Sequence, residues 1–234
     1  MTLHVKGLSA GKDGRSVISG IDLEIEPGKV TAVIGANGAG KSELVLALAG
    51  VLPIVAGEYR LDEKSLKGLG AESVRRAGVA AVPEGHRVLT ALSVDDNLRV
   101  AGALLKAGAD VQLRKAYELF PELAERKQQL AGTMSGGQQQ MLAIGQALMA
   151  APQYLLIDEM SLGLAPVIVK RLLAVVAALK ASGTGILLIE QFTDLALGIA
   201  ENAIVLRAGK MRYSGPAKKL ADDKALLHSA YFGL

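Results

Sequence analysis

The chain has 234 residues, of which 50% are hydrophobic and 21% are charged, and its net charge is only +3. This composition predicts a globular protein rather than a disordered one, and so small a basic surplus gives no reason to expect a nucleic acid partner. The absence of cysteine excludes disulfides, thiolate chemistry and cysteine-ligated metals.

Hydropathy gives no sign of a membrane-spanning segment. Residues 1–11 alternate apolar and polar side chains, so no signal peptide is expected. The most apolar helix-like stretch, Val167–Leu179, is interrupted by Lys170 and Arg171. If the protein works at a membrane, we expect it to dock onto another protein there.

Short strands and helices alternate along the chain. The expected strands are Leu3–Lys6, Ile21–Ile25, Val30–Ile34, Gly57–Leu61, Val79–Val82, Tyr154–Ile157, Ile186–Ile189, Ala203–Leu206 and Lys210–Tyr213. The expected helices are Lys41–Gly50, a helical region over 93–127, Gln138–Ala150, Pro166–Ala181 and Thr193–Ala200.

This alternation predicts an α/β fold with a mainly parallel core sheet, an antiparallel β portion near the N-terminus and an inserted α-helical lobe. We expect one domain over 1–234. Residues 1–92 and 150–234 would form the core with its β portion, and 93–149 the helical lobe.

A glycine-rich segment follows the apolar strand 30–34 and precedes a helix. It fits the phosphate-loop pattern G-x-x-x-x-G-K-[ST] with Gly35, Ala36, Asn37, Gly38, Ala39, Gly40, Lys41 and Ser42. Small residues let the backbone curl so that its N–H groups face phosphate oxygens, and the helix N-terminus adds positive potential. Lys41 would reach the β- and γ-phosphates of ATP, and Ser42 would bind Mg²⁺.

Two carboxylates stand at the end of an apolar strand. The run Tyr154–Ile157 is followed by Asp158 and Glu159, and ligands of open α/β sheets bind at the carboxyl ends of strands. Asp158 would hold Mg²⁺. Because side chains alternate along a strand, Glu159 points differently and can act as general base on the attacking water.

A third motif lies before the helix that precedes the acidic strand. Met134 is followed by Ser135, Gly136, Gly137 and Gln138, and a serine hydroxyl with glycine N–H groups at a helix start forms a second anion site. With these three motifs in this order, the sequence resembles the ATP-binding cassette (ABC) family over nearly its whole length. The resemblance implies that residues 135–138 face ATP bound by an opposite subunit, in a head-to-tail dimer of cassettes.

Other positions are assigned only through the resemblance. Glu84 stands where the family has the glutamine that links Mg²⁺ to the transport partner, and Gln191 stands where it has the switch histidine. The adenine-stacking aromatic of the family falls near Lys12, where this chain has no aromatic residue, so Lys12, Arg15 or Val17 would contact the base differently. Glu43 follows Ser42 in the nucleotide-binding segment.

Several departures from the general family pattern occur together. Pro83-Glu84-Gly85, the run Ser161–Pro166, and Glu190-Gln191 resemble the shorter ATPase subunit of branched-chain amino acid importers. The resemblance implies two transmembrane permease subunits, a substrate-binding protein acting indirectly, and a peripheral location on the cytoplasmic face of the membrane. The segment from His86 to Leu92 would receive a permease loop.

Three alternatives stay open from the sequence. A related importer for urea or other amides has similar motifs. A soluble, non-transport cassette in translation or DNA repair would usually carry tandem cassettes or coiled coils, which this chain lacks. A phosphate-loop kinase would leave the Ser135–Gln138 motif without a role.

Overall fold

Two sheets and ten α-helices form the computed structural model, which describes residues 1–13, 15–85, 87–103 and 108–233. The described strands are β1 (Leu3–Lys12), β2 (Arg15–Ile25), β3 (Val30–Ile34), β4 (Ile54–Leu61), β5 (Lys64–Ser65), β6 (Val79–Val82), β7 (Tyr154–Asp158), β8 (Gly185–Ile189), β9 (Asn202–Arg207) and β10 (Lys210–Pro216). The described helices are α1 (Lys41–Leu48), α2 (Ala71–Arg76), α3 (Val94–Gly102), α4 (Ala109–Leu119), α5 (Pro121–Ala124), α6 (Gly136–Leu148), α7 (Pro166–Ala181), α8 (Thr193–Ile199), α9 (Ala217–Asp222) and α10 (Lys224–Phe232), with a 3₁₀ turn at Ala131–Thr133.

The larger sheet is the core of the molecule. Its strand order is β10-β9-β3-β8-β7-β6, and every neighbouring pair is parallel except β9 with β10. All five residues of β3, of β7 and of β8 are buried, as expected for parallel strands covered on both faces. The parallel register brings the carboxyl ends of these strands to one edge, confirming the predicted α/β class.

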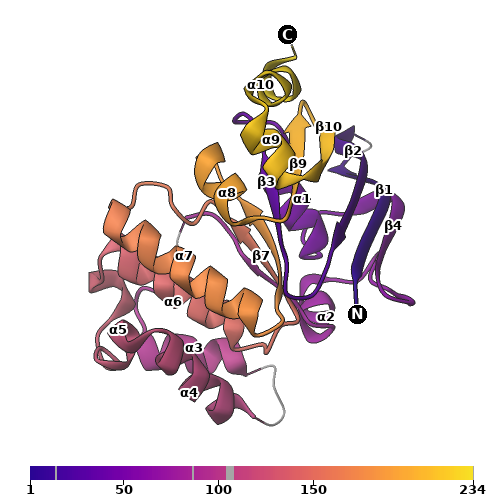
Figure 1. Cartoon of the computed structure of the whole chain (residues 1–234). Coiled ribbons are helices and arrows are strands. Elements are labelled where there is room, and N and C mark those ends of the chain that lie inside the picture. The colour runs from indigo at the N-terminus through magenta and orange to yellow at the C-terminus, as the bar shows by residue number, and fades with distance from the viewer. Residues whose placement is uncertain (14, 86, 104–107, 234) are drawn as a thin grey trace.

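The smaller sheet is antiparallel, in the order β2-β1-β4-β5. It lies beside the core sheet, at the right of Figure 1, and α1 packs between the two sheets. Strands β1 and β2 are each about twice as long as predicted because bulges let them bend through Gly7 and Gly20, both in the left-handed region.

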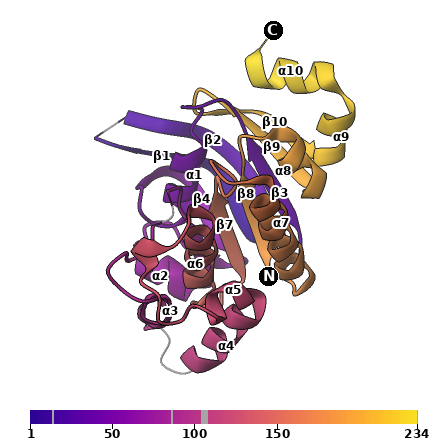
Figure 2. The same cartoon turned by 90° about the vertical axis from the view of Figure 1, so that its left-hand side faces the viewer.

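Helices cover the faces of the core sheet in two groups. The group α3–α7 forms the lobe at the lower left of Figure 1 and shares one apolar cluster with β6, β7 and β8. The group α8–α10 packs on β3 and β9, and α10 extends from the body at the upper right of Figure 2. The sequence analysis did not predict α2, α9 or α10, of which α2 and α9 have only six residues each.

One buried amide ties the helical lobe to the loop after β6. Asn97 is fully buried in α3, and its Oδ1 accepts hydrogen bonds from the Leu89 backbone N–H (2.8 Å) and from Gln146 Nε2 (2.9 Å). Its Nδ2 donates to the carbonyls of Leu89 (3.0 Å) and Ser93 (2.8 Å). The amide is therefore satisfied on both sides, and it fixes the loop against α3 and α6.

Within the described residues, no helix is both long and apolar enough to cross a membrane.

Candidate active site

The phosphate loop is shaped by contacts that only glycine permits. Gly38 and Gly40 have φ of 74° and 102°, in the left-handed region that favours glycine. A Cβ on Gly35 would lie 2.3 Å from the Leu206 carbonyl oxygen, and one on Gly40 would lie 2.6 Å from Ile18 Cγ2. The backbone therefore curls tightly between β9 and β2 before α1 begins at Lys41.

Lys41 places a buried cation at the centre of the loop. Its side chain is 5% exposed, and Nζ donates to the carbonyls of Gly35 (2.9 Å) and Ala36 (3.2 Å). Nζ also lies 3.7 Å from Oε1 of Glu159. This ammonium is offset by one carboxylate at ion-pair distance, and the loop around it can accept a phosphate at the N-terminus of α1.

Asp158 is a buried carboxylate at the end of β7. It is 3% exposed, and its Oδ1 has no hydrogen-bond partner. Burial raises the pKa of Asp158 to about 6, a hydrogen bond from the Ser42 side chain lowers it, and the charges of Glu159 and Glu84 raise it. An orphaned acceptor beside a hydroxyl suits a hard cation with oxygen ligands.

Glu159 turns sharply out of the strand. Its φ is 50°, in the left-handed region, and its backbone N–H donates to the carbonyl of Ile189 at 3.0 Å. That bond joins the ends of β7 and β8. Its carboxylate is 11% exposed and lies at ion-pair distance from Lys41, so the structure places Glu159 beside the phosphate loop.

The turn between β9 and β10 supports the phosphate loop, and the sequence analysis did not identify this turn. Ala208 and Gly209 have φ of 49° and 72°, as in a two-residue hairpin turn of type I′. Gly209 N–H donates to the carbonyl of Ala39 (2.9 Å), and its own carbonyl accepts from Ser19 N–H (2.8 Å). The Ala208-Gly209 pair between the two expected strands was the available signal.

The two residues assigned to the adenine end lie on the β1–β2 hairpin. Val17 is 48% exposed, and its carbonyl oxygen would be 2.1 Å from a Cβ on Gly209. The structure therefore brings Val17 beside the β9–β10 turn, which in turn contacts Ala39 of the phosphate loop. Lys12 is exposed and pairs with Arg15 at the far end of β1. No hydrogen bond or ion pair joins Lys12 to residues 35–42, all of which the structure describes.

Glu84, Gln191 and Glu43 border the same edge of the core sheet. Glu84 is exposed after β6 and close enough for its charge to raise the pKa of Asp158. Gln191 is exposed, two residues after the end of β8. Glu43 is half-buried in the first turn of α1. His86 lies outside the described residues.

Ser135, Gly136, Gly137 and Gln138 lie apart from these groups. Ser135 and Gly136 are exposed at the start of α6. A capping box holds the helix: Ser135 Oγ accepts from Gln138 N–H (3.4 Å), and Gln138 Oε1 accepts from Ser135 N–H (3.0 Å). Gly137 packs on Ile168, 2.8 Å from where its Cβ would be. No hydrogen bond or ion pair links 135–138 to 35–42 or to 158–159 in this single chain, where all three segments are described.

Comparison with known proteins identifies the class. The sequence pattern of the ABC transporter family matches residues 18–161, and the chain belongs to that family. It is a nucleotide-binding ATPase cassette.

The particular relatives are ATP-binding proteins of transport systems. The chain is 44% identical over 215 residues to the high-affinity branched-chain amino acid transport ATP-binding protein BraG of Pseudomonas aeruginosa, covering 91% of each. It is 32% identical to the probable branched-chain amino acid transport ATP-binding protein LivF of Archaeoglobus fulgidus, covering 95% of each. A solved ATP-binding subunit of an ABC transporter superposes with a TM-score of 0.83 at 28% identity, covering 97% of this chain and 94% of that one.

Replacing Gly209 with alanine tests the support of the phosphate loop. The added Cβ would meet Val17 O at 2.1 Å in a left-handed backbone, with strain of about 1–3 kcal/mol. We expect this strain to fall on the loop and to raise the dissociation constant for ATP about 5- to 150-fold, measured with a fluorescent ATP analogue. Gly198→Ala in α8, where nothing lies within 4 Å, should bind ATP normally. Normal binding by Gly209→Ala would contradict the role.

Asp158 predicts a pH dependence of stability in the nucleotide-free protein. Between its ordinary pKa near 3.8 and its folded pKa of about 6, the folded chain keeps a proton that the unfolded chain has released. Stability therefore falls as the pH rises through this window, by about 1–3 kcal/mol. Melting temperatures with a chelator present should show a shallower decline for Asp158→Asn. Asp110→Asn, at a site 77% exposed, should keep the wild-type slope, and an unchanged slope in Asp158→Asn would refute the assignment.

Proposed function

We propose that this chain is the ATP-hydrolysing subunit of an ABC importer for branched-chain amino acids. The observation that carries the substrate class is the 44% identity to BraG across 91% of both chains. The chain would act at the cytoplasmic face of the membrane, bound to two permease subunits that receive substrate from a binding protein.

The nucleotide site is proposed from the geometry of the phosphate loop. Residues 35–42 would enclose the triphosphate, with Lys41 exchanging its loop carbonyls for phosphate oxygens. Glu43 would border the phosphates, and Val17 and Lys12 the adenine end. Glu159 would orient and deprotonate the water that attacks the γ-phosphorus in line with the departing ADP oxygen, and Gln191 would hydrogen-bond a γ-phosphate oxygen.

A divalent cation fits the neighbouring oxygen atoms. Ser42 and Asp158 would bind Mg²⁺, with Glu84 from the adjacent strand end. Among the described residues no group of three or more His, Cys, Asp or Glu could hold a metal alone, and Mg²⁺ is typically bound by one or two carboxylates with phosphate oxygens. The ion would neutralise charge that develops on the phosphates. The observation that supports a cation here is that Oδ1 of Asp158 is buried without a hydrogen-bond partner.

A second cassette would complete the site. The exposed cap of α6, Ser135 and Gly136 with Gly137 and Gln138 behind it, provides N–H and O–H donors that have no phosphate to bind within one chain. In a head-to-tail dimer these donors would cover the ATP of the partner.

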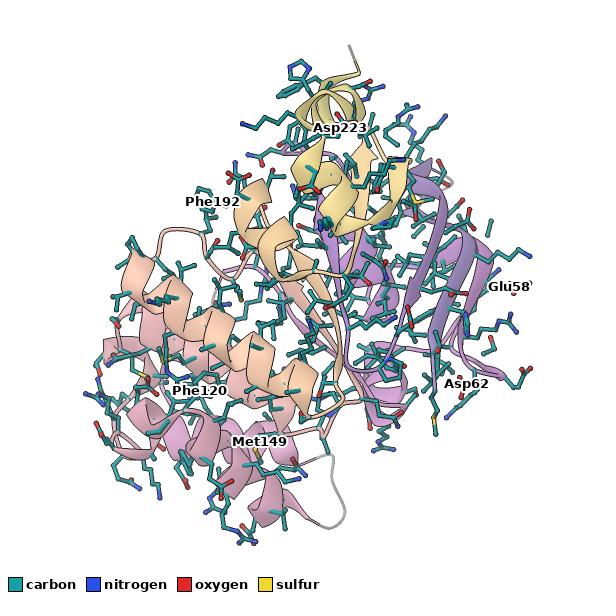
Figure 3. All side chains as sticks on the ribbon, viewed as in Figure 1. Glu58, Asp62, Phe120, Met149, Phe192 and Asp223 are labelled. Carbon is teal, nitrogen blue, oxygen red and sulfur yellow. The ribbon has the colours of Figure 1, made fainter. Side chains whose placement is uncertain are left out.

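Three exposed apolar side chains lie on the turn before α7, on its first turn and before α8: Leu162 (43% exposed), Val167 (71%) and Phe192 (56%). Figure 3 shows Phe192 projecting from the surface, and a partner would remove these side chains from water.

A groove beside the helical lobe would receive the permease. It has a volume of about 290 Å³ and is lined by residues that include Arg75, Pro83, Arg87, Leu89 and Val100. Arg87 is exposed and Leu89 is 46% exposed, so the groove offers both charge and apolar surface. Residues 93–149, which carry α3 to α6, would act as the subdomain that moves with the permease against the core of 1–92 and 150–234.

Two substitutions separate binding from hydrolysis. Glu159→Gln keeps the side chain's shape but removes the base, so ATP should still bind while kcat falls at least about 100-fold. Lys41→Ala removes the buried cation and should raise the ATP dissociation constant instead. Nucleotide titration and phosphate release measure the two effects. Equal loss of binding in both variants would show that the roles are wrongly assigned.

Charge reversal at Arg87 tests the permease groove. In vesicles containing the assembled transporter, we expect wild type to drive ATP-dependent uptake of leucine and not of urea. Arg87→Glu should lower leucine uptake several-fold while the isolated subunit still binds ATP, because no residue of 35–42 lines the groove. Arg212→Glu, at an exposed position of β10, is the control and should transport normally. Normal uptake by Arg87→Glu with normal assembly would count against docking there.

A further inference from the structure

A buried acid lies beside the proposed base and is not used by the proposed chemistry. Glu190, directly after β8, is 1% exposed, and its Oε1 has no hydrogen-bond partner. Its other oxygen, Oε2, accepts from the Ser161 hydroxyl at 2.5 Å, and Ser161 is 2% exposed. Burying a carboxyl group costs free energy, so the burial of Glu190 against Ser161 needs an explanation.

The contact joins two loops that flank the site. Ser161 comes two residues after Glu159, and Glu190 comes one residue before Gln191. A second bond runs parallel to it, from Glu159 N–H to the Ile189 carbonyl at 3.0 Å. Residues 159–161 are thus fastened to 189–190 at two points, one through the backbone and one through side chains.

Ser161 also begins the turn that carries the exposed apolar surface. Leu164 N–H donates to the Ser161 carbonyl at 3.2 Å, and Gly163 at the third position has φ of 72°, which is a type II turn. The turn projects Leu162, 43% exposed, from a base that is almost fully buried. The exposed side chain of Leu162 and the buried Ser161–Glu190 contact therefore belong to the same turn.

We propose that Glu190 is a positioning residue for ATP hydrolysis, which holds Ser161 so that the turn at 161–164 and the carboxylate of Glu159 keep a fixed relation. This inference rests on the proposed role of Glu159. Glu190 acts through Ser161 and touches neither phosphate nor water.

The proposed role needs Glu190 only as a hydrogen-bond acceptor, not as a charged group. Burial raises the pKa of Glu190 to about 7, the hydrogen bonds from Ser161 lower it, and the charge of Glu159 raises it. Glu159, from the end of β7, is the charged side chain that faces it. A neutral amide at 190 can still accept from the Ser161 hydroxyl, whereas alanine cannot.

The test is a double-mutant cycle on steady-state ATP hydrolysis by the assembled transporter. We expect Ser161→Ala and Glu190→Ala each to lower kcat about tenfold with KM for ATP within about twofold, because binding through residues 35–42 is unaffected. The double variant should be no slower than the slower single variant, because both remove one contact. Glu190→Gln should keep most of the wild-type kcat. Ser182→Ala, which removes an exposed hydroxyl bonded to the Leu179 carbonyl, is the control.

Three results would overturn the inference: normal kcat in Ser161→Ala, multiplicative losses in the double variant, or a Glu190→Gln variant as slow as Glu190→Ala. Ser161→Ala removes one small hydroxyl, so it remains informative if Glu190→Ala does not fold. Wild type and Glu159→Gln are measured alongside. If Glu159→Gln turns over ATP normally, the proposed role of Glu159 fails, and the inference fails with it; if Glu159→Gln is inactive while Ser161→Ala is normal, only the positioning role of Glu190 fails.

Discussion

The buried ammonium of Lys41 is the interaction around which the site is organised. It lies among carbonyls of its own loop and 3.7 Å from Glu159, where few water molecules can screen it. Close by, Asp158 has an acceptor without a partner and a pKa raised to about 6. The Lys41 ammonium and the Asp158 carboxyl group do not fully meet each other's need for charge and hydrogen bonds. A triphosphate with its cation would supply an anion to the first and a positive charge to the second.

The parallel strands make this arrangement possible. Ile157 pairs with Leu188 and Asp158 with Ile189, while Val33 pairs with Ile189 on the other side of β8. The phosphate loop, the acidic pair and the loop at 190–191 therefore leave the sheet at one level. A shift of one residue in β7 would turn Asp158 to the opposite face, and the fully apolar strands on either side hold that register.

The sequence was sufficient for features that depend on neighbours along the chain. Strands β3 and β6 and helix α7 begin and end where periodicity and the proline at 166 predicted, and the phosphate loop and acidic strand end lie at one edge of the sheet as expected. Contacts distant in sequence could not be read. Gly209 supports Ala39 from 170 positions away, and Ser161 meets Glu190 across 29. Neither pair has a local pattern, because each depends on which strands become neighbours.

The cap of α6 has a consequence for the cost of assembly. Ser135 Oγ already accepts the Gln138 N–H, and Gln138 already accepts the Ser135 N–H, so the first turn is ordered before any other molecule approaches. A hydroxyl that accepts with a lone pair still has its hydrogen to donate. The end of the helix is therefore preorganised: an arriving anion meets donors already in place, and little conformational entropy is lost when two copies close around it.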